Sequence, residues 1–356
     1  MKNWKIPSEG LNVETADGRR RSHHSQQQIP CERAVADYCC PAGSHKASDP
    51  AAPGSHAVIR RLTLNVPHFL RTLVAVAMHG TTDAVRVALV LSAGGLRGAA
   101  HVGVLRQLVR HGIRIDAVVG VSAGAVIAAY YAAVGLELDD LISDAERFRG
   151  RHLLTYSVNV QLGYRFERRL DTWCGVIPDR LRQLDLASFD RLHHGIERLG
   201  IVCHDVIAGE PRYFASGNDG VQLHEVVRAS ASIPRLFPPV AVRCHGRELH
   251  LTDGGISDPV PVSFALGPAI GATHLIVSDS RWLGRMPAAR SNIVWIRPRM
   301  ASTGTLWSPR RGLLATVRNG ETAVTDEVVA RIREWFAVAQ PADQTVHCLH
   351  SMSANR

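Results

Sequence analysis

The sequence predicts an α/β protein in which helices cover both faces of a mainly parallel central sheet, a three-layer α/β/α arrangement. Strand-like runs alternate with helical segments from residue 85 onward, as in successive βα units. The first of these runs, 87–91, is apolar throughout, which favours a strand that is buried on both faces. The first two strands each lead into a glycine-containing turn and then a helix, and binding sites of open α/β sheets lie at that carboxyl edge.

The same alternation continues along the chain. We expect strands over residues 87–91, 116–120, 201–208, 248–252, 273–278 and 292–296. We expect helices over residues 99–111, 123–134, 138–148, 223–230 and 321–336. Residues 151–189 combine aromatic side chains with many arginines and have no clear period, so we interpret this segment as a cap over the site.

The chain is expected to divide into four segments. Residues 1–56 are rich in Ser, His, Gln, Pro and Gly, and we predict a disordered tail because they carry too little apolar surface to offset the entropy of ordering. Residues 57–83 hold an arginine-bearing amphipathic helix and a linker. Packing of this helix on the flank of the main domain is the favoured interpretation, and binding to a membrane surface is the alternative. We expect residues 84–300 to form the main domain and residues 301–356 to form a C-terminal helical extension.

Length and composition exclude some classes of protein. The chain has 356 residues, of which 46% are hydrophobic, enough for one large α/β domain or two small ones. It contains no run of about 18 apolar residues, so we expect no membrane span. No apolar stretch follows Lys2 and Lys5, so we expect no secretory signal. The prediction is a cytoplasmic protein with at most a peripheral contact with membranes.

The net charge of +9 is carried almost entirely by arginine. Such a surface could attract anionic membranes or nucleic acid. A solvated arginine-rich surface is the simpler interpretation, and we predict no nucleic-acid partner. The seven cysteines have no regular spacing, which argues against a disulfide framework or a cysteine-based metal site. We predict no metal site.

A Gly-x-Ser-x-Gly pentapeptide stands between the strand-like run 117–119 and a helix of small residues. It reads Gly120-Val121-Ser122-Ala123-Gly124. In this strand-to-helix context the pentapeptide is typical of a nucleophile elbow, whose tight turn forces the serine into a strained backbone conformation. Gly120 and Gly124 leave room for the neighbouring strand and helix. We therefore predict that Ser122 is a nucleophile at a helix N-terminus, where backbone N–H groups favour a developing anion.

A glycine-rich loop follows the first strand and precedes the helix at 99–111. It reads Gly94-Gly95-Leu96-Arg97-Gly98. A dinucleotide-binding loop would need an acidic residue at the end of a second strand about twenty residues further on, and the serine pentapeptide occupies that place. A P-loop would need a Gly-Lys-Ser/Thr sequence, which this loop lacks. Glycines at the start of a helix expose backbone N–H groups, so an oxyanion hole fits best.

A nucleophilic serine needs a base, and Asp253 is the leading candidate. It lies in Asp253-Gly254-Gly255, directly after the apolar strand 248–252. Its place at a strand end favours the same sheet edge as Ser122, although an Asp-Gly pair is also common in surface turns. By itself the Asp-Gly-Gly sequence leaves both interpretations open.

The three motifs together resemble the patatin-like phospholipase family, whose pattern is a glycine-rich oxyanion loop, then Gly-x-Ser-x-Gly, then Asp-Gly-Gly far downstream. Further family-like stretches lie at residues 229–234, 237–239 and 258–261. The resemblance covers residues 85–300. Ala93 departs from the pattern, because the family usually has the first glycine of its loop there; Gly94, Gly95 and Gly98 keep the hole.

The resemblance implies a patatin-like fold and a lipid acyl hydrolase of the phospholipase A or lysophospholipase type, with a lipid or phospholipid as substrate. Asp253 would take the proton of Ser122 as the serine attacks the ester carbonyl, and would then protonate the leaving alcohol and activate water. The oxyanion would rest on backbone N–H groups around Gly94, Gly95 and Arg97. The Arg97 side chain could attract a lipid phosphate or stabilise the loop. No metal or organic cofactor is needed.

Two other classes of function stay open. A Ser-His-Asp α/β-hydrolase would share the elbow, but its nucleophile normally follows several strands, whereas Ser122 closes the second βα unit. A non-catalytic lipid-binding relative is the other class, and the intact serine, aspartate and glycines argue against it. Among the histidines, His101 lies closest to the expected site, in the first turn of the helix after the glycine loop. We predict a structural role for His101 and a dyad without histidine.

Overall fold

The structure is a computed structural model of the chain. It describes residues 84–162, 173–217, 220–281, 284, 288–300, 303–306 and 312–338. The expected disordered tail (1–56) and the amphipathic helix with its linker (57–83) lie outside these residues.

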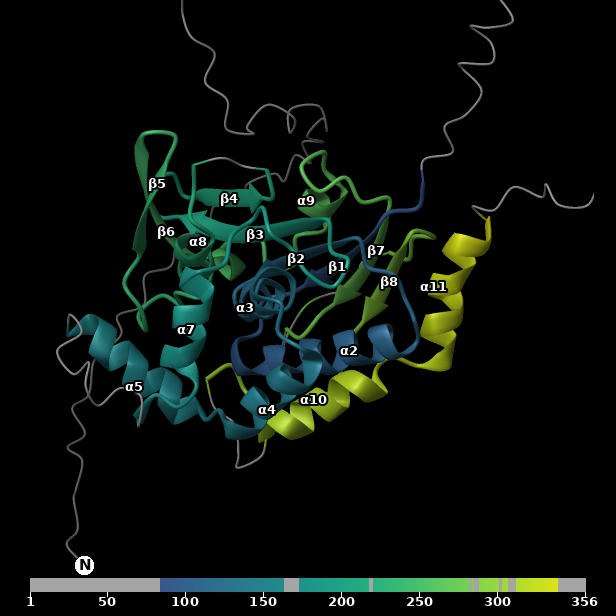
Figure 1. The fold of residues 1–356 in the computed structure, drawn as a ribbon, viewed down its shortest axis with the longest axis horizontal. Helices are drawn as coiled ribbons and strands as arrows, with labels where there is room; N and C mark the ends of the chain where they lie inside the picture. Colours follow the sequence, from purple (N-terminus) through teal and green to yellow (C-terminus); the bar gives the residue numbers. More distant parts are fainter. Residues whose placement is uncertain are drawn as a thin grey trace, which may run out of the picture. The chain divides into compact units, whose positions relative to one another are not determined.

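An eight-stranded sheet forms the middle layer of the described domain (Figure 1). The strands are β1 (Val87–Leu91), β2 (Ala117–Val121), β3 (Arg198–Asp205), β4 (Glu210–Ala215), β5 (Val240–Cys244), β6 (Arg247–Asp253), β7 (His274–Ser278) and β8 (Ile293–Ile296). Their order is β5-β6-β3-β2-β1-β7-β8, and β4 also pairs with β3. β1, β2, β3, β7 and β8 run parallel, whereas β4, β5 and β6 form antiparallel pairs. The predicted α/β class with a mainly parallel sheet is therefore confirmed.

Helices flank this sheet. They are α2 (Ala99–Arg110), α3 (Ala123–Ala129), α4 (Leu138–Arg147), α5 (Gly150–Gln161), α7 (Ile177–Asp185), α8 (Leu223–Ser230), α9 (Val262–Leu266), α10 (Gly312–Thr322) and α11 (Asp326–Val338). Three shorter helical turns are η1 (Gly95–Gly98), η2 (Tyr130–Val134) and η4 (Gly254–Ile256). The expected helix over 223–230 agrees with α8, and the expected helix over 99–111 agrees with α2 to within one residue.

Alternate residues of the central strands enter two hydrophobic cores, one on each face of the sheet. Along β1, Val87, Leu89 and Leu91 belong to the larger core, and Ala88 and Val90 belong to the smaller one. Successive side chains of a strand point to opposite faces, so a strand with both faces covered must be apolar throughout. Helices α2, α3, α8 and α10 contribute to the larger core, and α9 contributes to the smaller core.

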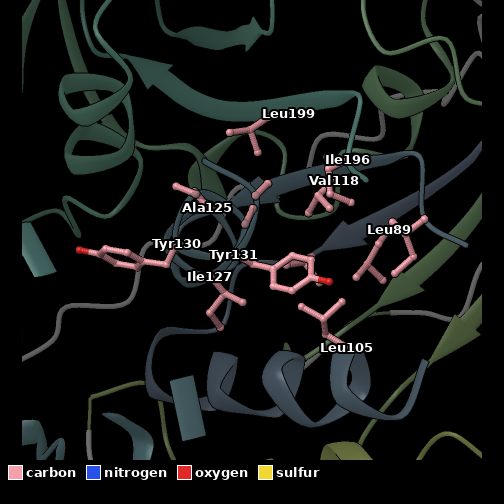
Figure 2. Close-up of a cluster of buried hydrophobic side chains, with 14 of the residues drawn as sticks. Leu89, Leu105, Val118, Ala125, Ile127, Tyr130, Tyr131, Ile196 and Leu199 are labelled. Carbon is pink, nitrogen blue, oxygen red and sulfur yellow. The ribbon is translucent and has the colours of Figure 1, made fainter. Parts of the chain in front are cut away.

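The larger core brings α2 and α3 against the sheet. Figure 2 shows Leu89 and Val118 of the sheet facing Leu105 of α2, with Ala125 and Ile127 of α3 beside them. α3 consists of Ala, Gly, Val and Ile, and these small side chains allow its backbone to lie close to the strands. This close approach fixes the position of the turn before α3 relative to the sheet.

Helix α10 packs on α2 through a glycine from each helix. A Cβ at Gly103 of α2 would collide with the carbonyl of Val317, and one at Gly320 of α10 would collide with the carbonyl of Ala100. The two backbones are therefore in direct contact, and Leu313 and Val317 of α10 join the same hydrophobic core as α2.

Two elements differ from expectation for local reasons. The single helix expected over 321–336 is divided between α10 and α11, because the Thr325 hydroxyl accepts a hydrogen bond from the Val328 N–H at 3.4 Å and caps a new helix. The strand expected over 201–208 ends at Asp205. The Asp205 carboxylate accepts hydrogen bonds from the N–H groups of Ile207 and Ala208, which turns the chain into the β3–β4 hairpin.

Candidate active site

The turn after β2 holds Ser122 in a strained conformation. β2 ends at Val121 and α3 begins at Ala123. Ser122 between them has φ 57° and ψ −124°, a region that residues with a side chain avoid. A Cβ at Gly120 would collide with the Gly124 carbonyl, and one at Gly124 would collide with the backbone of β1. The turn therefore has the conformation expected of a nucleophile elbow.

A second strand brings Asp253 to this turn from the opposite direction. β2 pairs with β3 as far as Val121, opposite Val202, and β6 pairs with the next residue of β3, Cys203, through Asp253. Since β4 occupies the other side of β3 along both stretches, β2 and β6 lie on the same side of β3 and meet with their carboxyl ends together. A Cβ at Gly254 would collide with the Val202 carbonyl, so the chain can leave β6 there only without a side chain.

This meeting of strand ends produces a direct contact between the two predicted residues. The Ser122 hydroxyl donates a hydrogen bond to Oδ2 of Asp253 at 2.7 Å. The other carboxylate oxygen of Asp253 accepts the Gly255 N–H at 2.8 Å. Ser122 is 4% exposed and Asp253 is 6% exposed, so water competes little for this contact.

Burial dominates the electrostatics of Asp253. It raises the pKa of the carboxyl group, and the hydrogen bonds from Ser122 and Gly255 oppose the rise only in part. Within the described residues no cation forms an ion pair with Asp253. A carboxylate with a raised pKa is a stronger base than a solvated aspartate, which is the property that a proton acceptor for a hydroxyl requires.

Ser230, which the sequence analysis did not single out, forms a hydrogen bond with the backbone of the elbow. Oγ of Ser230, at the end of α8, accepts the Ser122 N–H at 2.9 Å and donates to the Val202 carbonyl at 2.6 Å. It thereby fastens the strained turn to β3. Ser230 lies in one of the family-like stretches, but a serine at a helix end has no pattern of its own that would have marked it.

The glycine loop adopts the helical turn η1 beside the elbow. A Cβ at Gly98 would collide with the side chain of Ala123, so the loop and the start of α3 are in contact. The Leu96 N–H donates to the carbonyl of Thr305 at 2.8 Å and the Arg97 N–H donates to the carbonyl of Gly94 at 3.2 Å. The N–H groups of Gly94 and Gly95 have no acceptor in the part of the chain that the structure describes.

The Arg97 side chain is directed into the protein. Its guanidinium donates hydrogen bonds to the carbonyls of Ser280, Arg281 and Thr303, and the residue is 5% exposed. Burial lowers its pKa, and the nearby Asp279 opposes that change. Arg97 does not line the cavity beside Ser122. Of its two expected roles, these contacts favour stabilising the loop over attracting a lipid phosphate.

His101 is buried behind the loop and contacts other groups than Ser122. Its Nδ1 lies 2.7 Å from the Ser278 hydroxyl and its Nε2 lies 3.0 Å from the carbonyl of Ser92. A carbonyl only accepts hydrogen bonds, so Nε2 carries the proton and Nδ1 accepts from Ser278. Burial lowers the pKa of His101 from its ordinary 6.5 to about 4, which keeps the ring neutral at physiological pH.

A cavity of about 500 Å³ adjoins Ser122 and the glycine loop. Its walls are mainly apolar, and α5 and α7, which lie in the segment 151–189, contribute Leu153, Tyr156, Ile177 and Leu181. An ion pair between Asp144 and Arg180, with Nε 2.6 Å from Oδ2, is the main charged feature among the described lining residues. The cavity has the size and character of a site for an apolar ligand.

In the described ranges no helix has both the length and the apolar content that crossing a bilayer requires. Across those same ranges, no three His, Cys, Asp or Glu side chains gather in a way that could hold a metal ion.

Comparison with known proteins gives one family and several relatives. The sequence model of the family described as patatin-like phospholipase matches residues 89–266. An uncharacterized NTE family protein of Mycobacterium tuberculosis is 31% identical over 237 residues, which cover 64% of this chain and 60% of that protein. The lysophospholipase NTE1 of Scheffersomyces stipitis is 31% identical over 212 residues, which cover 54% of this chain and 12% of that protein. The chain therefore spans about three fifths of the mycobacterial relative.

Among solved structures, the crystal structure of VipD from Legionella pneumophila is similar to this chain with a TM-score of 0.42 and 16% sequence identity. The similar part covers 70% of this chain and 67% of VipD.

Proposed function

The chain belongs to the patatin-like phospholipase family, and from this premise we propose that it is a lipid acyl hydrolase, a phospholipase A or a lysophospholipase, that uses a Ser122–Asp253 dyad. The observation that carries the proposal is the 2.7 Å hydrogen bond from the Ser122 hydroxyl to Asp253, next to an apolar cavity of about 500 Å³. The similarity to a fungal protein named lysophospholipase supports the same class of substrate.

The first step forms a tetrahedral intermediate on the serine. Asp253 accepts the hydroxyl proton while Ser122 Oγ attacks the ester carbonyl carbon, and the carbonyl oxygen becomes an oxyanion. The N–H groups of Gly94 and Gly95 are the proposed donors to that oxygen, because they have no acceptor in the described part of the chain. The Arg97 N–H joins them only if its hydrogen bond to the Gly94 carbonyl gives way. Each such donor contributes about 10²–10³ in rate.

The second step releases both products. The proton on Asp253 passes to the alkoxide oxygen of the leaving alcohol as the C–O bond breaks, which leaves an acyl ester on Ser122. A water molecule then attacks this ester while Asp253 takes one proton from the water, and Asp253 passes that proton to Ser122 Oγ as the bond between Oγ and the acyl carbon breaks and the fatty acid departs. A single carboxylate can both accept a proton from Oγ and return one to it, because Oδ2 lies within hydrogen-bond distance of Oγ.

The cavity supplies the proposed acyl-binding site. Its apolar walls stabilise an alkyl chain by about 0.8 kcal/mol for each buried CH₂ group. Because Ser122 and Gly95 both line this cavity, a chain bound there would present its ester group to the serine. The preference for lipid esters over small polar esters follows from this binding energy.

The test of the proposal removes the nucleophile. Ser122→Ala is expected to lower kcat for a lipid ester by at least about 10³-fold, with no loss of the fold. A fluorophosphonate, which reacts with activated serines, is expected to label the wild type and to leave this variant unlabelled. Ser278→Ala is the matched control, because Ser278 is a buried serine that contacts His101 instead of Asp253. The Ser278→Ala protein is expected to be labelled like the wild type. Labelling of a serine other than Ser122 would contradict the proposal.

A further inference from the structure

Helix α5 carries apolar side chains on two faces. Its inner face contributes Leu153, Tyr156 and Val160 to the cavity. Its outer face presents Leu154, Val158 and Leu162, the last of them directly after the helix, with exposed fractions of 46%, 54% and 47%. At 3.6 residues per turn, the centres of the two sets are about 170° apart around the helix axis. The outer set therefore forms a continuous apolar stripe that faces away from the cavity.

Hydrogen bonds to a neighbouring loop fix the orientation of this helix. The Ser157 hydroxyl donates to the carbonyl of Leu236, and the Gln161 side chain donates to the same carbonyl at 2.7 Å. His152 and Asn159 of α5 are buried. Figure 1 shows α5 at the margin of the domain next to α7. The exposure of the outer stripe is therefore a consequence of how the helix is fastened.

The charges on α5 give this stripe a particular chemistry. Arg151 lies three residues before Leu154, so it stands on the same face of the helix, and it is exposed. No acidic residue occurs in α5. Exposed leucine and valine side chains with an arginine at their edge and no acidic residue suit a helix that lies in the plane of a membrane interface.

We propose that the outer stripe of α5, made of Arg151, Leu154, Val158 and Leu162, binds the surface of a lipid bilayer that contains anionic lipid. The thickness of a single helix would separate such a bilayer from the cavity. A helix with its side chains is about 10–12 Å across, and interfacial helices sink about 5–10 Å into the boundary between head groups and acyl chains. A bilayer in contact with the stripe would thus lie within one helix diameter of the cavity behind it.

The position of α5 between the outer stripe and the cavity favours a bilayer over a protein partner. The inner face of α5 lines the cavity that adjoins Ser122, so the same helix separates that cavity from the surface in contact with the stripe. This part of the argument rests on the proposed function, because it takes the substrate from the bilayer. The binding of the stripe to lipid itself is independent of catalysis.

The test measures the binding of the full chain to vesicles of phosphatidylcholine and phosphatidylglycerol by co-sedimentation. The variant Leu154→Ser/Val158→Ser/Leu162→Ser is expected to bind these vesicles at least about tenfold more weakly than the wild type, because three apolar side chains no longer enter the interface. Its matched control, Val109→Ser/Val206→Ser/Ile207→Ser, removes three exposed apolar side chains elsewhere, with exposed fractions of 42%, 47% and 75%. The control is expected to bind like the wild type.

A second arm separates this inference from the proposed function. The stripe variant is expected to hydrolyse a soluble short-chain ester at the wild-type rate, since none of its three changed residues lines the cavity. Arg151→Glu is expected to weaken binding to anionic vesicles and to reduce its dependence on salt. Unchanged vesicle binding by the stripe variant overturns the inference. If the wild type binds vesicles through the stripe but hydrolyses no ester, the proposed function fails and the lipid-binding surface stands.

Discussion

Two groups of polar side chains, each with a serine and an aspartate, lie at the carboxyl ends of strands in this domain. One consists of Ser122 and Asp253, at the ends of β2 and β6. The other consists of Ser278 and Asp279, at the end of β7, with His101 of α2. By composition the second group is the closer match to a Ser-His-Asp triad. It nevertheless lies entirely inside the protein, since all three of its residues are 0% exposed, and none of them lines the cavity.

The two aspartates differ in the charged groups that surround them. Asp279 forms ion pairs with Arg281 at 2.8 Å and with Arg297 at 2.5 Å, and hydrogen bonds from both arginines outweigh burial and lower its pKa. Asp253 is as deeply buried but has no such partner among the described residues, and its pKa is raised. A carboxylate surrounded by cations is a weak base. We therefore propose the Ser122 group as the reactive one on the basis of its access to the cavity and its lack of a counter-charge, more than on residue type.

The largest expected effect comes from replacing each aspartate by its amide. Asp253→Asn keeps the shape but removes the proton acceptor, so kcat is expected to fall by about 10²–10⁴ while stability is retained. Asp279→Asn leaves two arginines without their buried partner, and the free energy of unfolding is expected to fall on the order of 3 kcal/mol. Ester hydrolysis and urea denaturation of both variants measure the contrast.

The same two variants can also contradict the different roles given to Asp253 and Asp279. In a Ser-His-Asp enzyme built on Asp279, the folded Asp279→Asn protein would lose activity as completely as Ser122→Ala. If a folded Asp253→Asn protein retained its activity, the proposed Ser122–Asp253 dyad would be contradicted.

The pH dependence of kcat/KM tests the raised pKa of Asp253. The carboxyl group must be ionised to accept a proton, so activity is expected to fall about tenfold per pH unit below its pKa. Because burial raises that pKa, the acid limb of the profile is expected above the ordinary value of about 4 for aspartate. Measurement of initial rates on a soluble ester locates the limb. A limb at or below pH 4 would show that Asp253 titrates like a solvated residue and would contradict the role given to its burial.

The smallest effect on turnover is expected at His101. Its folded-state pKa of about 4 lies below the ordinary 6.5, so between these values the unfolded chain binds a proton that the folded chain does not. Stability from this residue is complete above about pH 6.5 and is lost as the pH falls towards 4, by about 3 kcal/mol in total. His101→Gln is expected to abolish that part of the pH dependence, as measured by urea denaturation at several pH values, and to lower kcat far less than Asp253→Asn.

A different result at His101 would be equally clear. A folded His101→Gln protein with as little activity as Ser122→Ala would place the histidine in the reaction, and the buried group would no longer be a structural one. An unchanged stability profile would contradict the neutral, buried state of the ring.

Local sequence determined the parts of the site that are made by neighbouring residues. The apolar run 87–91, the glycine loop and the pentapeptide around Ser122 each specify a strand, a turn or a helix start within a few positions. Their conformations depend on side-chain alternation and on glycines that leave room for backbone. The predicted strand at 87–91 agrees with β1, and the strained φ of Ser122 is the one that the elbow pattern implies.

The tertiary structure decided what depends on residues far apart in the chain. Asp253 lies 131 residues after Ser122, and it meets the serine because β6 runs antiparallel along the same side of β3 as β2, a pairing that strand propensity does not encode. The role of the Arg97 side chain also depends on distant carbonyls. Segment 151–189 had no clear period because α5 is apolar on two opposite faces, one towards the cavity and one towards solvent. A helix that contacts two different apolar environments loses the one-sided pattern from which helices are predicted.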